Sequence, residues 1–69
     1  MPSPSADPTI QMIDSLMARL LKWRSDAATL VHDPDVGERV HHALLDVAYV
    51  LEYLKAARSE REQKLRRAS

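Results

Sequence analysis

A break at Asp33-Pro34 separates two long stretches of helical apolar periodicity, and it constrains the fold more than any other feature. Asp33 is a good helix N-cap, and Pro34 suits the first helical position because it has no N–H to leave unpaired. Pro34 also disfavours the α conformation at Asp33, so the preceding helix has to end near His32. Gly37, the only glycine, falls close to this break, where close packing would favour it. The sequence therefore predicts two helices joined by a very short turn at 32–34.

The bounds of the two helices follow from the same kind of signal. Asp7-Pro8 repeats the Asp-Pro pair, so the first helix is predicted to run from about 8 to 31, with Asp7 as its cap. The second helix is predicted to run over 34–62. The valines and tyrosines of 44–54 also suit a strand, but no turn residues bound this stretch and the helical period continues on both sides. We therefore predict helix there.

The flanking segments and the composition limit the class of protein. Residues 1–6 hold two prolines and two serines and nothing to bury, so we expect a disordered arm. Residues 63–69 are expected to be a frayed basic tail, which leaves 7–62 as the hairpin. The chain has no cysteine and no apolar run of the about 20 residues that span a membrane. Its N-terminus lacks the features of a signal peptide, so we expect a single cytoplasmic domain.

Each predicted helix has an apolar face that covers about half of its circumference, wider than the ~100° stripe that one packing neighbour needs. A lone hairpin would leave half of each face in water, which is unusual for a monomer. A foreign protein would cover this surface equally well. We predict an all-α fold in which a two-helix antiparallel hairpin dimerises, or forms a higher oligomer, as a four-helix bundle. The residues expected at the dimer interface are Leu16, Leu20, Trp23, Val47, Leu51 and Leu54.

Charge is distributed unevenly along the chain, although the formal net charge is zero. Residues 1–54 carry four basic and eight acidic side chains, whereas 55–69 carry six basic and two acidic ones. A basic end can contact nucleic-acid phosphates, or it can simply complement the C-terminal dipole of the second helix. Nucleic-acid binding is therefore the alternative function. The residues that would carry it are Arg58, Arg61, Lys64, Arg66 and Arg67.

Two tyrosines fall on the polar side of the second predicted helix, and Leu45 shares that side. Aromatic side chains are over-represented at the hot spots of protein interfaces, although they also pack at the edges of helix bundles. We predict a strip that binds a protein partner. It is formed by Leu45, Tyr49, Glu52 and Tyr53.

Glu38, His42 and Asp46 recur every four residues and therefore share one side of the second helix. Imidazole and carboxylate ligands at this spacing can bind zinc, and a solvated polar surface is the simpler interpretation. The chain has no nucleophile–base constellation, phosphate-binding glycine loop or cofactor motif, so we predict no enzyme activity and no cofactor. The main prediction is a small interaction or regulatory protein that binds itself and a protein partner. A metal-binding bundle ranks third.

Overall fold

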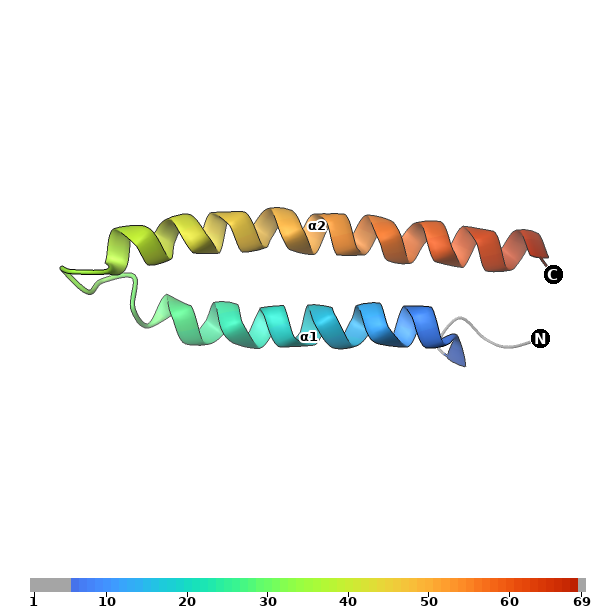
Figure 1. Ribbon diagram of the computed structural model, residues 1–69, viewed down its shortest axis with the longest axis horizontal. Helices are drawn as coiled ribbons and strands as arrows, with labels where there is room; N and C mark the ends of the chain where they lie inside the picture. The colour runs from blue at the N-terminus through green and yellow to red at the C-terminus, as the bar shows by residue number, and fades with distance from the viewer. Residues whose placement is uncertain (1–5, 69) are drawn as a thin grey trace.

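The computed structural model describes residues 6–68 and consists of two long helices that lie side by side (Figure 1). α1 comprises Pro8–Ala28 and α2 comprises Gly37–Ala68. The loop 29–36 reverses the chain, so the helices run antiparallel, and the extents of 54 × 16 × 10 Å correspond to a single layer two helices wide. The predicted all-α helical hairpin is confirmed. The stretch 44–54 is helical throughout, as predicted.

The first turn of α1 is capped as the sequence predicts. Asp7 has an extended backbone and its Oδ2 accepts a hydrogen bond from the Ile10 N–H at 3.1 Å. Pro8 occupies the first helical position, where no N–H is needed. Ile10 is fully buried, so the cap and the first core residue lie within one turn of each other.

The end of α1 differs from the prediction: the regular helix stops at Ala28 and not at Val31. Beyond Ala28 the backbone N–H groups bond to carbonyls three residues back, as in the 2.9 Å bond from Leu30 to Ala27. The Thr29 hydroxyl also donates to the Asp26 carbonyl at 2.7 Å. Such bonds tighten the last turn and end the α-helical pattern, and the apolar periodicity of the sequence does not reveal them.

The start of α2 also differs from the prediction, because the regular helix begins at Gly37 and not at Pro34. Asp33 does act as a cap: its Oδ1 accepts from the N–H groups of Asp35 at 2.8 Å and Val36 at 3.1 Å. Its carbonyl accepts from the Gly37 N–H at 2.9 Å, which closes one separate turn before the helix. The predicted turn at 32–34 is therefore an eight-residue loop.

Gly37 is buried, and the backbone of the loop passes directly over it. A Cβ atom at this position would lie 2.2 Å from the Val31 carbonyl oxygen and 3.3 Å from that of Leu30. The close packing expected of the only glycine is confirmed, and it joins the first turn of α2 to the start of the loop.

α2 continues to Ala68, past the predicted end at residue 62, so the described part of the predicted tail at 63–69 is helical. Glu62 forms ion pairs with Arg58 and Arg66, one turn before and one turn after it. Pairs at this spacing stabilise helices, and Leu65 is half-buried here. Of the predicted N-terminal arm, only the exposed Ala6 is described; residues 1–5, like Ser69, lie outside the described residues.

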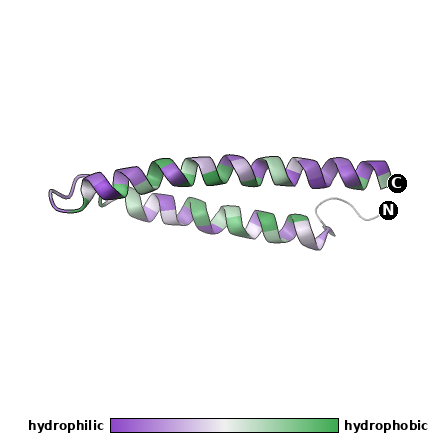
Figure 2. Ribbon diagram, turned by 45° about the horizontal axis from the view of Figure 1, so that its top comes forward, coloured by the Kyte–Doolittle hydropathy of each residue, from purple (hydrophilic) through white to green (hydrophobic). Residues whose placement is uncertain are grey.

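The core is the narrow contact between the two helices. Among residues 6–68 the buried apolar side chains are Ile10, Ala27 and Leu51, while ten large hydrophobic side chains are exposed. Figure 2 shows that the apolar residues extend along α1 and the middle of α2, whereas the last third of α2 is largely hydrophilic. Neither helix of the described chain has the length and apolar character needed to cross a membrane.

Candidate interaction surfaces

One broad side of the hairpin bears exposed apolar side chains from both helices. Together with the charged residues between them they follow one another at spacings of three and four, so within α1 and α2 they form a stripe along each helix. The last member on the α1 side, Leu30, and the first on the α2 side, Val36, belong to the loop. We call this surface the open face, and it has the same order of residues on its two halves: apolar, Arg, Trp or Ala, Asp, apolar. Its members are Leu16, Arg19, Trp23, Asp26 and Leu30 on the α1 half and Val36, Arg39, Ala43, Asp46 and Val50 on the α2 half.

A hollow in the open face shows that its two halves belong to one surface. The hollow has a volume of about 240 Å³ and lies between the helices near the loop. Trp23 and Leu30 line it from α1 and are 42% and 46% exposed, while Ala43 lines it from α2. A groove that is rimmed by apolar side chains and left open to water is a common feature of protein interaction sites.

The charged residues of the open face are almost free of partners within the chain. Among the ion pairs of the described residues, none involves Arg19, Arg39 or Asp46. Asp26 meets only Lys22, at 3.6 Å, and both side chains are largely exposed. The open face therefore presents two unpaired cations and two carboxylates next to apolar side chains.

The opposite situation holds at the end of the hairpin that carries the chain termini. Arg58 donates from Nε to Oδ1 of Asp14 at 2.8 Å. Arg61 donates from Nε and Nη2 to the two carboxylate oxygens of Asp7, at 3.1 and 3.0 Å. The hydrogen bond from Arg61 lowers the pKa of Asp7, and those carboxylates raise the pKa values of the two arginines. These contacts join α1 to α2.

The basic residues predicted to bind nucleic acid are therefore divided between two roles. Arg58 and Arg61 are held by carboxylates of α1, and Arg66 meets Glu62 at 3.3 Å. Lys64 and Arg67 are exposed and take part in no ion pair among the described residues. Less positive charge is available for phosphate contacts than the sequence suggests.

The residues predicted for a dimer interface fall into two groups. Leu51 is 5% exposed and packs between the helices of the same chain. The half-buried Leu20, Val47 and Leu54 also flank this internal contact. Trp23 and Leu16 instead lie on the open face. The predicted set thus combines the core of the hairpin with a surface that remains free.

The predicted partner-binding strip lies on the outer side of α2. Leu45, Tyr49 and Tyr53 are 51%, 66% and 75% exposed, and their spacing of four residues places them in one row. Glu52 is exposed beside them and accepts a hydrogen bond from Lys55 at 3.3 Å. The structure brings these four residues together as one surface.

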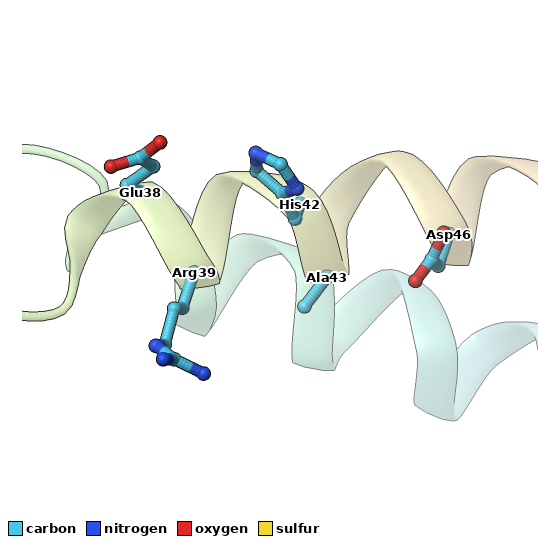
Figure 3. A pocket seen from close by; sticks show the side chains of 5 residues that line it. All are labelled: Glu38, Arg39, His42, Ala43 and Asp46. Atoms are coloured by element: carbon cyan, nitrogen blue, oxygen red, sulfur yellow. The ribbon is translucent and has the colours of Figure 1, made fainter.

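A second, more open depression of about 550 Å³ lies at the start of α2 and includes Glu38, His42 and Asp46. Figure 3 shows that Glu38 and His42 project to one side of the helix, while Arg39 and Ala43 project to the other. Within residues 6–68, no three His, Asp or Glu side chains are arranged to hold a metal ion. The residues with the spacing of a zinc site therefore do not form one here.

The sequence contains a signal for the open face that averaging over the helical arcs does not reveal. Arg19 and Asp26 fall just outside the apolar arc of the first helix, on its polar side and next to the edge that Leu16, Trp23 and Leu30 form. The repeated order of residue types on both helices is the feature that identifies them. No protein-family model matches this sequence, and comparisons with curated proteins and with solved structures give no match.

Proposed function

We propose that this chain is a small non-enzymatic interaction protein that self-associates and presents a helix surface to a protein partner. One observation carries the proposal: the described residues expose ten large hydrophobic side chains and bury only three apolar ones. A chain that acts alone in water rarely exposes so many large apolar side chains for so few that it buries. Association with another polypeptide removes this surface from water.

The small core of this hairpin is a reason to expect self-association. A chain below about 70 residues rarely gains more than about 3–5 kcal/mol from its own core and usually needs further support. This chain has no cysteine to form a disulfide. A second hairpin packed on the first adds a core layer, and binding to the folded state raises its stability by mass action.

The outer strip of α2 is the surface proposed for the protein partner. Tyr49 and Tyr53 supply large, stiff, amphipathic side chains, which are typical anchors of protein interfaces. Leu45 adds an apolar contact at one end of the row, and Glu52 adds a charge at its rim. Because this strip lies on the side of α2 away from α1, it stays accessible when another surface of the hairpin is covered.

Sedimentation equilibrium of the full chain, from about 1 to 500 μM, tests self-association. The expected result is a mass of two chains or more, with dissociation on dilution and a melting temperature that rises with concentration. A mass of one chain over the whole range, with a constant melting temperature, contradicts the proposal.

Photo-crosslinking in the native host tests the partner strip. A photoreactive residue at Tyr49 is expected to capture a specific protein, and the same residue at the exposed Ser25 of α1 is the matched control. The substitution Tyr53→Ala, combined with the probe at Tyr49, should reduce the yield. Equal capture from both positions contradicts a dedicated strip.

Nucleic-acid binding remains the second proposal, and it has less support because Arg58 and Arg61 are engaged by carboxylates of α1. The free cations that remain, Lys64 and Arg67, lie in the last turns of α2. Cations at this position also complement the helix dipole.

A cytoplasmic location is part of the main proposal, and fractionation of the host tests it.

A further inference from the structure

We infer that the open face is covered by the open face of a second copy of this chain, in an antiparallel stack of helices. This inference rests on the proposed self-association, and it names the surface and the partner that the proposal leaves open. Three features of the described residues carry it: the free charges, their order along the helices, and the hollow beside Trp23.

The charges of the open face are of both signs, so they are complementary to a surface that also carries both signs. They do not match a partner surface that is only acidic or only basic. The face holds two arginines and two aspartates, and among residues 6–68 only Asp26 forms an ion pair, with the exposed Lys22. An acidic or a basic partner would oppose two of the four charges with like charge, which weakens binding. A second copy of the same face offers two arginines and two aspartates in return.

The order of residues along the helices also places opposite charges across from each other when two open faces are stacked. A two-fold axis between the stacked faces lies either along the helices or across them. In the first case α1 faces α2 of the other copy, and in the second case each helix faces its own counterpart. The facing helices run antiparallel in both cases, so the order apolar–Arg–Trp/Ala–Asp–apolar is opposed by its reverse. Arginine is therefore brought toward aspartate in either arrangement.

The hollow supplies the apolar part of the contact. Trp23 and Leu30 leave about 240 Å³ open beside the small side chains Ala27 and Ala43. A second open face carries leucine, valine and tryptophan at intervals of one or two helical turns. Side chains of this size fill such gaps when helices pack in a bundle.

Two complementary variants test the inference. Arg19→Glu with Arg39→Glu makes the charges of the open face entirely acidic, and Asp26→Lys with Asp46→Lys makes them entirely basic. Each variant alone is expected to self-associate at least about tenfold more weakly than the natural chain, because four like charges on one face then meet four of the same sign on the other. An equimolar mixture of the two is expected to form a heterodimer and to recover the lost affinity.

Matched controls change the same net charge away from the open face. Arg24→Glu with Lys64→Glu serves for the acidic variant, and Asp35→Lys with Glu60→Lys serves for the basic one. Circular dichroism checks that each protein stays helical. In the natural chain, the emission of Trp23, the only tryptophan, is expected to shift to longer wavelength as dilution exposes the open face.

The outcomes separate this inference from the proposed function. A natural chain that is monomeric throughout overturns both. A natural chain that self-associates, together with charge variants that do so equally well, overturns the assignment of the open face and leaves self-association standing. Weakened variants that fail to recover on mixing overturn the matched stacking of two copies.

Discussion

Arg61 donates two hydrogen bonds to the carboxylate of Asp7, from Nε at 3.1 Å and from Nη2 at 3.0 Å. The same carboxylate accepts the Ile10 N–H and so caps α1. One aspartate therefore caps the start of α1 and attaches it to α2 across 54 positions of sequence. Its side chain is 9% exposed, so water competes little for these bonds.

The first prediction concerns the acid stability of this contact. Hydrogen bonding from Arg61 holds the pKa of Asp7 below the ordinary value of 3.8. A carboxyl with a lowered folded-state pKa contributes stability above its unfolded pKa and loses it as the pH falls through the folded value. The melting temperature of the natural chain should therefore fall as the pH is lowered below 3.8.

The substitution Asp7→Asn isolates the charge, because asparagine is also a good N-cap. We expect this variant to melt several degrees lower at neutral pH and to lose less stability in acid, as measured by circular dichroism at a fixed concentration. Asp35→Asn, in the exposed loop, is the control and should retain the natural pH profile. Equal acid sensitivity of the natural chain and Asp7→Asn would show that the contact with Arg61 does not stabilise the fold.

The contrast between caps and contacts shows what the sequence could predict. The cap of α1 at Asp7 depends on residues within three positions and is predicted correctly, whereas Asp33 caps a separate turn and α2 begins only at Gly37. The pairing of Asp7 with Arg61 depends on how α1 and α2 are aligned, which no local pattern specifies. The sequence alone therefore suggests that Arg61 binds phosphate, whereas in the structure it donates to the carboxylate of Asp7.

The sequence pattern also does not show which part of each apolar arc packs inside the hairpin and which part stays exposed. The breadth of each arc indicated more surface than one neighbour covers, but it could not say which part faces the other helix of the same chain. Leu51 was assigned to a dimer interface and is buried inside the hairpin, whereas Leu16 and Trp23 lie on the open face. The loop was predicted too short because backbone bonds to carbonyls three residues back end α1 early.

The second prediction concerns Gly37. In an exposed helix position, replacing glycine by alanine would stabilise the fold by about 1 kcal/mol. Here the new Cβ would lie 2.2 Å from the Val31 carbonyl oxygen, so the loop or the first turn of α2 has to move. We expect Gly37→Ala to destabilise the chain by about 1–3 kcal/mol in urea unfolding. Ser59→Ala in exposed α2 should be neutral or slightly stabilising, and a stabilising Gly37→Ala would mean that the loop does not pack this closely.

The third prediction concerns Ile10, which is fully buried next to the Asp7 cap. Ile10→Val removes one methylene group and should lower the free energy of unfolding by about 1 kcal/mol. The chain buries so little else that Ile10→Ala should leave it largely unfolded as an isolated monomer. Leu21, which is 43% exposed, provides the control: Leu21→Val should have less than half the effect of Ile10→Val. Similar losses at the two positions would contradict the described core.

The final prediction separates protein binding from nucleic-acid binding. If the proposed function is correct, gel-shift assays with RNA or duplex DNA should show at most weak binding at low salt, abolished by about 200 mM salt. Lys64→Gln with Arg67→Gln should remove this weak binding. Arg24→Gln with Lys22→Gln removes the same amount of charge from α1 and should leave the binding unchanged. Binding that persists in salt and requires Arg58 or Arg61 would contradict this expectation. It would mean that these arginines exchange their carboxylates in α1 for phosphates, and nucleic-acid binding would then replace protein binding as the better proposal.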